Sequence, residues 1–532
     1  MASAVLGGLL AAAAALPQAP RDSSTAGTLR ATTHLVQVSV VARTKQGEPV
    51  SGLTQEDFTL LDVGRLEKIA FFRSEAAQPA PAKARLLPPG LYTNRLDLGG
   101  AGPASATVIL FDALNTQFAD QAYARQQILT FLRQLKSGDH VALYAMGRGP
   151  RVLQEFTQDP TALISTLAGY KGEPSASLSA PMYDPAMSGV DHFEAWLGEV
   201  TFSLYDYYGE DRAFRTVRAL IAIAEHLERV PGRKNLLWVA GSFPVSIGGE
   251  SMAAPRRMAS DKRNAGPEVE RAARALSRSG LAIYPVDARG LMVGQQYVGS
   301  MLKPELRNPD TAEFATMQML AERTGGRAFF NNNDLAAALR RAVEDARLTY
   351  VLGYYPSHHD WKGRFRKIDL RVARPDVELL YRRGYFAQPD EPAEAWYRQR
   401  VLDAALWNPV DATGLRLTVA VTPASGGGRD LALQVVADDI AFRRNEGRWE
   451  CSLDVWLVQL DGQERQLKTD AHTNNLRLEQ PMYERVMQVK GLALAEHVDP
   501  QPQAQLLRVL VRDVASGALG SLTIPLKTPQ RK

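Results

Sequence analysis

Between residues 106 and 347, short apolar runs alternate with amphipathic segments, and this alternation constrains the fold more than any other feature of the chain. The apolar runs read ATVILF, HVALYAM, KNLLWVA, LAIYPV and RAFF, and each has the length of a buried strand. The segments between them repeat apolar residues at helical spacing, as at Val217, Leu220, Ala224 and Leu227. Strands that alternate with helices are typical of βαβ units. The pattern therefore predicts an α/β domain with a doubly wound, mostly parallel sheet over 106–347.

The helical segments of this region are predicted over 119–135, 211–230, 266–279, 311–323 and 334–347. Two longer irregular stretches, 171–205 and 243–264, interrupt the alternation. We expect both at the carboxyl edge of the sheet, where functional loops usually lie.

The α/β region is flanked by segments in which apolar and polar residues alternate with a period of two. An N-terminal β module over 32–73 and a set of strands over 348–387 are each too small to be stable alone. We therefore expect the two to pair, which would make the α/β domain an insertion within a β-sandwich. A second, independent β-sandwich is predicted over 413–528.

Two linkers separate these parts. Residues 74–105 are rich in Pro, Gly and Ala, and are predicted to be a linker or wrapping segment. Residues 388–412 are predicted to be a linker that contains one helix.

The N-terminal residues 1–20 form an apolar run of small residues that is typical of a secretory signal peptide. The run lacks a positively charged start, and a disordered Ala-rich leader is the alternative. No other apolar run reaches the roughly 18 residues that a membrane-spanning helix needs, so we expect no transmembrane segment beyond the leader. The predicted location is extracytoplasmic, which means periplasmic, at the cell surface or secreted.

The composition narrows the class of protein. Hydrophobic residues make up 45 % of the chain and charged residues 23 %, as in folded proteins. The 62 basic and 58 acidic residues are mixed along the chain, and the absence of a basic tract argues against nucleic-acid binding. The single cysteine, Cys451, precludes an intramolecular disulfide and is expected to be buried in a strand. The sequence assigns no oligomeric state.

A candidate site follows the first strand of the α/β region, because this strand ends at Asp112 and polar Asn115 and Thr116 come shortly after it. Ligands of doubly wound sheets collect beyond the carboxyl ends of the strands. A later strand, AIYPVD, also ends on a carboxylate, Asp287, and can place a second charge at the same edge.

The order of several motifs along nearly the whole chain resembles the von Willebrand factor type A-related proteins of the acidobacterial type. The motifs are GEPVSGLTQEDFTLLDVG, FDALNT, PGRKNLLWVAGSFP, AIYPVDARGL, LAERTGGRAF, VLGYYP, GRFRKIDLRV and RRGYF. The resemblance implies a type A domain that is extracytoplasmic and binds a partner rather than catalysing a reaction.

The resemblance also implies a Mg²⁺ site, made in this family by Asp-x-Ser-x-Ser, a Thr from a later loop and an Asp after strand four. Asp112 matches the first ligand and Thr116 the last hydroxyl, but Leu114 stands in place of the middle Ser. Ala240-Gly241-Ser242 stands where the second Asp is expected.

Three further residues are candidates for completing this site, namely Asn115, Thr201 and Asp287. We expect a degenerate site at which Mg²⁺ binds weakly or not at all. The alternative is that Asp112 and Asp287 only cap backbone amides at the ends of their strands.

Other polar groups suggest no catalytic site. His358 and His359 are adjacent and are expected in a hairpin turn, and Arg233 and Lys234 in a solvated connection. The tyrosines at 354, 355, 381 and 385 are expected to pack across strands. Nucleophile-elbow, phosphate-loop and zinc-protease motifs are missing from the sequence.

The sequence therefore predicts a non-enzymatic binding protein of the adhesion type, which recognises another protein or a surface polymer. The alternative is a structural or assembly component of the cell envelope that acts through its β-sandwich domains. A hydrolase is a distant third hypothesis.

Overall fold

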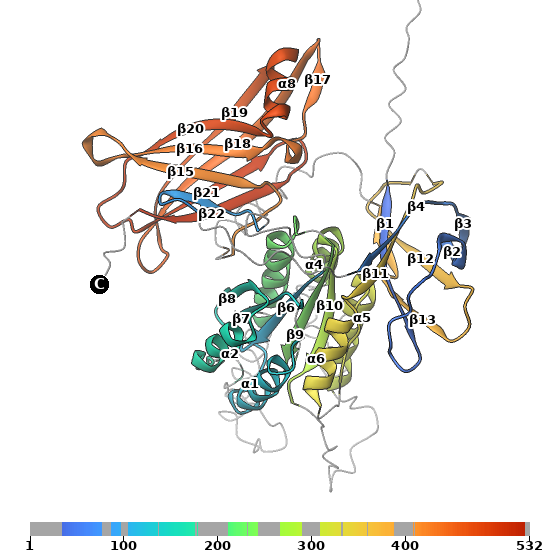
Figure 1. The fold of residues 1–532 in the computed structure, drawn as a ribbon. Helices are drawn as coiled ribbons and strands as arrows, with labels where there is room; N and C mark the ends of the chain where they lie inside the picture. Colours follow the sequence, from blue (N-terminus) through green and yellow to red (C-terminus); the bar gives the residue numbers. More distant parts are fainter. Residues whose placement is uncertain are drawn as a thin grey trace, which may run out of the picture.

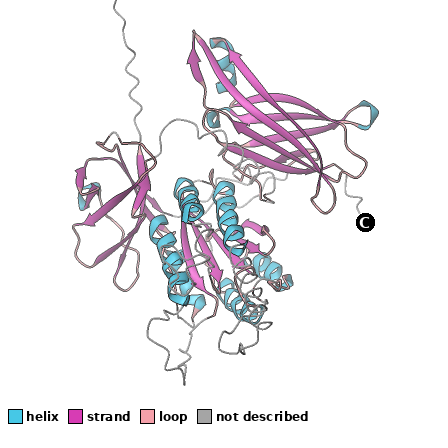
Figure 2. Cartoon of the chain, turned by 180° about the vertical axis from the view of Figure 1, so that it is seen from behind, coloured by secondary structure: helices cyan, strands magenta, loops and turns pink. Residues whose placement is uncertain are grey.

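The computed structural model describes residues 35–76, 87–96, 105–136, 138–175, 178, 211–230, 232–242, 266–289, 309–330, 334–358, 360–387, 408 and 410–526. They form an N-terminal β domain, an α/β domain and a C-terminal β domain (Figures 1 and 2). The predicted leader over 1–20 lies outside the described residues, as do Thr201, His359 and most of the predicted linker over 388–412. Within the described part of the chain, no helix is long and apolar enough to cross a lipid bilayer.

The α/β domain contains a five-stranded sheet in the order β10-β9-β6-β7-β8. Its strands are β6 (Ser105–Asp112), β7 (Val141–Met146), β8 (Pro150–Thr157), β9 (Arg233–Ala240) and β10 (Leu281–Asp287). β6 is parallel to both β7 and β9, and β10 is parallel to β9, whereas β8 is antiparallel to β7. The chain thus winds outward from β6 in one direction and then crosses to its other side. β6 is the strand at which the winding reverses, the place where such sheets bind ligands.

Helices cover both faces of this sheet (Figure 1). One face carries α1 (Phe118–Leu132), α2 (Pro160–Gly169) and α6 (Leu335–Glu344), and the other carries the helix over 211–226, α4 (Gly266–Ser279) and α5 (Pro309–Thr324). Alternate residues of β6 enter the two cores, with Leu110 on one face and Phe111 on the other. Because both faces are buried, the central strands are apolar at nearly every position.

Two elements of this domain, β8 and α2, are missing from the sequence prediction, and one predicted strand is not formed. β8 is an edge strand that contains the partly or fully exposed polar residues Arg151, Gln154 and Glu155, so it lacks the apolar run that predicted its neighbours. The predicted strand RAFF contributes a single parallel bridge, between Phe329 and Val286.

The N-terminal β domain combines strands from both sides of the α/β domain. Its two antiparallel sheets have the orders β13-β1-β11-β4 and β14-β12-β2-β3. The strands are β1 (Val36–Thr44), β2 (Phe58–Asp62), β3 (Arg65–Glu67), β4 (Ile69–Ala76), β11 (Leu348–Tyr354), β12 (Phe365–Val372), β13 (Val377–Tyr381) and β14 (Gly384–Phe386), with a short 3-10 helix η1 (Gln55–Asp57) before β2. β1 pairs with β11 and β13, and β2 pairs with β12. The α/β domain is therefore inserted between β4 and β11.

The C-terminal β domain also has two antiparallel sheets, in the orders β20-β16-β15-β5 and β17-β18-β21-β22, and β19 pairs with β18. The elements are β5 (Leu91–Thr93), β15 (Leu417–Pro423), β16 (Arg429–Val436), β17 (Arg443–Asn445), β18 (Arg448–Leu460), β19 (Gln466–Leu478), α8 (Gln480–Gln488), β20 (Gly491–Val498), β21 (Leu506–Asp513) and β22 (Leu519–Pro525), with 3-10 helices η2 (Ser425–Gly427) and η3 (Ala437–Asp439). Cys451 is buried in β18, where burial raises the pKa of its thiol to about 12. The core of the C-terminal β domain includes Leu417, Leu433, Leu453 and Val509.

β5 lies within residues 74–105, which were predicted to be a linker or wrapping segment. It pairs with β15 and appears as a blue strand among the orange ones of the C-terminal β domain (Figure 1). The next residue, Asn94, is 4 % exposed and acts as an extension of the ladder. Its Nδ2 donates to the carbonyls of Ala412 (2.7 Å) and Leu415 (2.9 Å), and its Oδ1 accepts from the Leu417 amide (2.6 Å). A strand of three residues is too short to show a period, and its partners are distant in the sequence.

We expect Asn94→Ala to lower the unfolding free energy of the C-terminal β domain by about 2 to 4 kcal/mol, because it leaves three buried backbone groups without partners. Urea unfolding and hydrogen exchange of the β15 amides measure the effect. The matched control is Asn445→Ala, since Asn445 is exposed and should change stability by less than about 0.5 kcal/mol. Equal effects of the two substitutions would contradict the role of Asn94.

Candidate functional site

Asp112 lies at the carboxyl end of β6. It is buried, and its carboxylate accepts hydrogen bonds from neighbouring groups of the protein. Its exposed fraction is 1 %. Oδ1 accepts from the Asn115 backbone amide (2.9 Å), and Oδ2 accepts from Asn115 Nδ2 (2.8 Å) and from Trp238 Nε1 (2.8 Å). Both carboxylate oxygens are therefore engaged by neighbouring donors.

The turn after β6 is tied to two other elements through Asn115 and Thr116. Asn115 Nδ2 also donates to the Thr216 hydroxyl (2.7 Å) in the helix over 211–226. The Asn115 carbonyl accepts from the amides of Gly241 (3.1 Å) and Ser242 (2.9 Å), and Thr116 Oγ1 accepts from the Gly241 amide (3.0 Å). The turns that follow β6 and β9 thus form one hydrogen-bonded unit.

Gly241 makes this close approach of the two turns sterically possible. A Cβ atom at this position would lie 3.2 Å from the Asn115 carbonyl oxygen and 3.3 Å from Thr116 Cα. Gly241 lies in the Ala240-Gly241-Ser242 turn, at which the resemblance in sequence implied a metal-binding Asp.

The environment of Asp112 disfavours its ionised form. Burial raises the pKa of Asp112 to about 6, although the hydrogen bonds from Asn115 and Trp238 act in the opposite direction. The desolvation of a carboxylate in an apolar core outweighs three donors.

Asp287 ends β10, two strands away from Asp112, and has its own partner. Its Oδ1 accepts from the Arg289 amide (3.0 Å) and Nε (3.1 Å), and its Oδ2 accepts from Arg289 Nη2 (3.2 Å). The carboxylate is 3 % exposed, so Arg289 compensates a buried charge.

The side chains at this edge of the sheet do not fit a Mg²⁺ ion, because Mg²⁺ requires about six oxygen ligands. The oxygens of Asp112, Thr116 and Asp287 accept hydrogen bonds from protein donors, and Leu114 supplies an apolar side chain in place of a hydroxyl. Within the described parts of the chain, no group of three or more His, Cys, Asp or Glu residues could hold a metal ion. Of the five predicted residues, the structure brings Asp112, Asn115 and Thr116 together, places Asp287 apart and leaves Thr201 outside its described range.

Trp238 and Thr216 belong to this cluster and were missed from the sequence. Trp238 is fully buried in the middle of an otherwise apolar strand. A buried indole N–H needs a hydrogen-bond acceptor. The position of Trp238 in the middle of a predicted buried strand could therefore have indicated a polar partner. Thr216 carried no comparable signal, because its partner comes from a distant segment.

Phe118 lies close to this buried cluster in the sequence and is exposed to solvent. It is the first residue of α1, close to Asn115 and Thr116, and 60 % of its side chain is exposed. Among the described residues of the α/β domain, no other large apolar side chain is as exposed. The edge therefore presents an aromatic ring on a rigid base.

Other sequence expectations are corrected by burial. Arg233 and Lys234 are 3 % and 4 % exposed rather than solvated. Arg233 donates to the Tyr284 hydroxyl (3.0 Å) and the Gly325 carbonyl (2.6 Å), and Lys234 Nζ donates to the Val230 carbonyl (2.6 Å). Burial lowers the pKa of Lys234 to about 8.

The tyrosines of the N-terminal β domain do more than pack across strands. The hydroxyls of Tyr354 (3.2 Å) and Tyr385 (2.8 Å) both donate to Oδ2 of the buried Asp62. His358 Nε2 lies 2.7 Å from the Tyr385 hydroxyl, so this histidine belongs to the same network.

No family model and no curated protein matches the chain. Among solved structures, a von Willebrand factor type A protein from Catenulispora acidiphila is 9 % identical, with coverage of 87 % of this chain and 72 % of that one and a TM-score of 0.24. An aerotolerance-related membrane protein from Bacteroides fragilis NCTC 9343 is 13 % identical over 45 % of this chain and 98 % of that one (TM-score 0.25). Three N-terminal domains of a type V pilus tip protein from Porphyromonas gingivalis are 8 % identical over 86 % and 77 % (TM-score 0.25). Because these TM-scores are below 0.5, the similarities assign neither a fold nor a function.

We expect Asp112→Ala to lower the unfolding free energy by about 3 kcal/mol at pH 7.5, because three buried donors lose their acceptor. The loss should increase by about 2 kcal/mol at pH 4.5. The folded pKa of about 6 lies above the ordinary value of 3.8, so protonation of Asp112 stabilises the folded wild-type chain as the pH falls through this interval.

Urea unfolding at pH 7.5, 6.0 and 4.5 measures this difference. The control is Asp369→Ala, which removes a half-exposed carboxylate from β12 and should have a small effect at each pH. A difference between wild type and Asp112→Ala that shrinks toward pH 4.5 would contradict the raised pKa.

Proposed function

We propose that the chain is an exported, non-enzymatic binding protein of the adhesion type, related to the von Willebrand factor type A proteins of acidobacteria. Its α/β domain would recognise another protein or a surface polymer with the carboxyl edge of its sheet. The observation that carries the proposal is the exposed Phe118 beside the buried cluster of Asp112, Asn115 and Thr116. Aromatic side chains on rigid supports are frequent centres of binding energy.

The proposed recognition needs no tightly bound metal ion. The three hydrogen bonds to Asp112 and the ion pair of Asp287 with Arg289 support this part of the proposal, since a metal would have to displace them. The cluster instead stabilises the turn from which Phe118 projects.

The proposal contains no catalytic step. Asp112 is buried and hydrogen-bonded to an indole, an amide side chain and a backbone amide, and none of these groups is a nucleophile that it would activate. The buried carboxylate therefore has a structural role in the proposed function.

A structural or assembly role of the C-terminal β domain is the second candidate, and a specific surface favours it. Met482 and Val489, at and just after α8, are 50 % and 59 % exposed. Tyr483 of the same helix stacks on Trp449, with ring centroids 4.1 Å apart. This apolar surface offers a contact site that is independent of the α/β domain.

Single substitutions on the two surfaces distinguish these functions. We expect Phe118→Ala to reduce capture of the partner from a native envelope fraction by at least about tenfold, because the central aromatic contact is lost. Met482→Ala is the matched control, as it removes an exposed apolar side chain from the other surface. The reverse result, with capture lost only in Met482→Ala, would favour the assembly role.

Titration with Mg²⁺ or Mn²⁺ tests whether binding is independent of metal. We expect no saturable heat at metal concentrations below about 1 mM, and equal capture of the partner with and without a chelator. The size-matched variant Asp112→Asn should behave as wild type in both measurements. Micromolar binding that Asp112→Asn abolishes would overturn this part of the proposal.

A further inference from the structure

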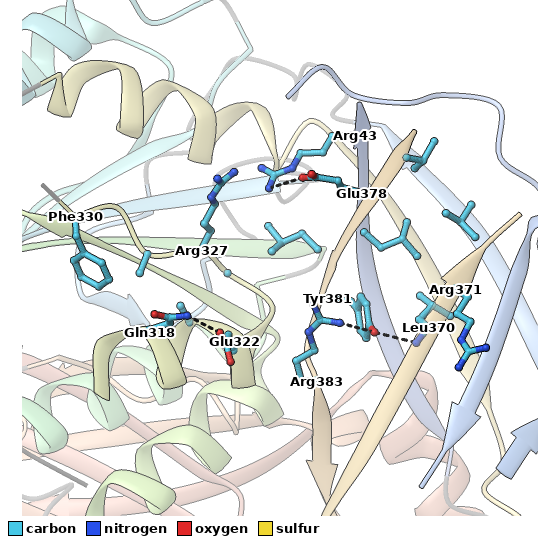
Figure 3. A pocket seen from close by; sticks show the side chains of 17 residues that line it. Arg43, Gln318, Glu322, Arg327, Phe330, Leu370, Arg371, Glu378, Tyr381 and Arg383 are labelled. Carbon is cyan, nitrogen blue, oxygen red and sulfur yellow. Dashed lines mark hydrogen bonds and ion pairs between the residues drawn. The ribbon is translucent and has the colours of Figure 1, made fainter. Parts of the chain in front are cut away.

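A cavity of about 700 Å³ lies between the α/β domain and the N-terminal β domain (Figure 3). One wall is formed by α5 and the segment after it, including Gln318, Glu322 and Arg327. The other wall is formed by β12 and β13, with Arg43 from β1. The volume is typical of a pocket for a small molecule.

The charge cluster next to the cavity is separate from the carboxyl edge that carries Asp112. Arg233, in the charge cluster next to the cavity, is the first residue of β9, and Asp345 of the same cluster directly follows α6. These residues lie at the amino edge of the sheet, whereas Asp112 and Asp287 end their strands at the opposite edge.

Close backbone packing holds the two walls together. A Cβ atom at Gly326 would lie 1.8 Å from the Ile283 carbonyl oxygen, so only glycine allows this segment to rest on β10. Gly325 has a φ of +78°, and a Cβ atom there would lie 2.6 Å from the Arg382 amide nitrogen. The Arg383 amide donates to the Glu322 carbonyl (3.2 Å) across the boundary between the domains. The shape of the cavity is therefore set by the backbone.

Two arginines from opposite walls are directed toward the same part of the cavity (Figure 3). Arg43 is only 7 % exposed, and its guanidinium lies 3.8 Å from Asp345 and 3.7 Å from Glu378. Arg327 makes no hydrogen bond or ion pair with the residues that the structure describes, and its guanidinium carbon lies 5.8 Å from the centre of the Phe329 ring. The contacts of Arg43 are long, and Arg327 has no direct counter-charge.

The charges around these two arginines do not balance. Arg43, Arg233 and Arg327 act on Asp345, and Arg43 and Arg341 act on Arg327 together with Asp345 and Glu378. Burial and the nearby charge of Arg43 lower the pKa of Arg327, whereas Asp345 and Glu378 act in the opposite direction. The cavity is lined by four arginines, Arg43, Arg327, Arg371 and Arg383, and by two glutamates, Glu322 and Glu378. A ligand with two negative charges would stabilise this excess of positive charge.

We propose that this cavity binds a small polyanion with at least two carboxylate or phosphate groups, held between Arg43 and Arg327. Guanidinium groups bind both kinds of oxyanion through paired hydrogen bonds. The apolar side chains of Phe330 and Leu380 line the same cavity and contact the uncharged part of the ligand. Because its two anchors come from different domains, the ligand also stabilises the contact between them.

Calorimetric titration of the full chain with inorganic pyrophosphate and with citrate tests the proposal. We expect saturable binding of at least one probe, with one site per chain and a dissociation constant below about 1 mM at low salt. Added sodium chloride should weaken the binding, and the uncharged sugar sucrose should not bind. Binding of pyrophosphate alone supports a phosphate ligand, and binding of citrate alone supports a carboxylate ligand.

The variant Arg327→Ala should weaken the binding of the probe by at least about tenfold, because one of the two anchors is lost. Arg327 is exposed at the rim, so its removal should leave the circular dichroism spectrum and the melting temperature of the free chain unchanged. Arg371→Ala is the matched control, because Arg371 also lines the cavity but pairs with Asp369 and lies apart from Arg43 and Arg327 in Figure 3.

Two results would overturn the proposal. One is the lack of saturable binding of either probe at low salt. The other is an equal loss of binding in Arg327→Ala and Arg371→Ala, which would indicate general attraction to a basic surface. Phe118→Ala should bind the probes like wild type, so this test is independent of the proposed function.

Discussion

The antiparallel ladder of β1 with β11 and β13 is the interaction on which the arrangement of the molecule depends. It joins strands that precede the α/β domain to strands that follow it, and both ends of that domain are thereby held on one body. The segment between β4 and β6 also contributes β5 to the C-terminal β domain, where Asn94 completes the backbone hydrogen bonds. The chain thus contributes strands to both β domains before the α/β sheet begins.

At the carboxyl edge of that sheet, a buried carboxylate accepts hydrogen bonds from the protein instead of facing solvent. Asp112 lies where the winding of the sheet reverses, which is a favourable place for a ligand. Trp238 in the adjacent strand brings an indole N–H into the same apolar environment, and this donor needs an acceptor. Asp112 accepts hydrogen bonds from Trp238 and Asn115 and thereby stabilises the fold, and Phe118 remains exposed at the same edge.

At the opposite edge of the sheet, the positive charge of the arginines exceeds the negative charge of the nearby carboxylates. Arg43 of the N-terminal β domain and Arg327 of the α/β domain meet near Asp345 and Glu378. Gly325 lets the two domains approach closely, and Gly326 lets its segment pack against β10. Close backbone packing and an uncompensated positive charge are thus consequences of the same domain contact.

The sequence by itself determined the periodic elements of the fold and the end of the strand at which Asp112 lies. Apolar runs and helical spacing are local properties, so they predicted β6, β7, β9 and β10, the helices near them, and strands on both sides of the α/β domain. Strands without a clear apolar pattern were not predicted, namely the edge strand β8 and the three residues of β5.

Only the tertiary structure decided which polar groups are free to act. The donors to Asp112, the burial of Arg233 and the partners of Asn94 all come from segments that are distant in the sequence. A hydrogen bond or a desolvation depends on distances in space, and periodicity carries no information about them. For this reason the sequence could place Asp112 at the carboxyl end of its strand, while only the structure showed that the carboxylate accepts hydrogen bonds from Asn115 and Trp238.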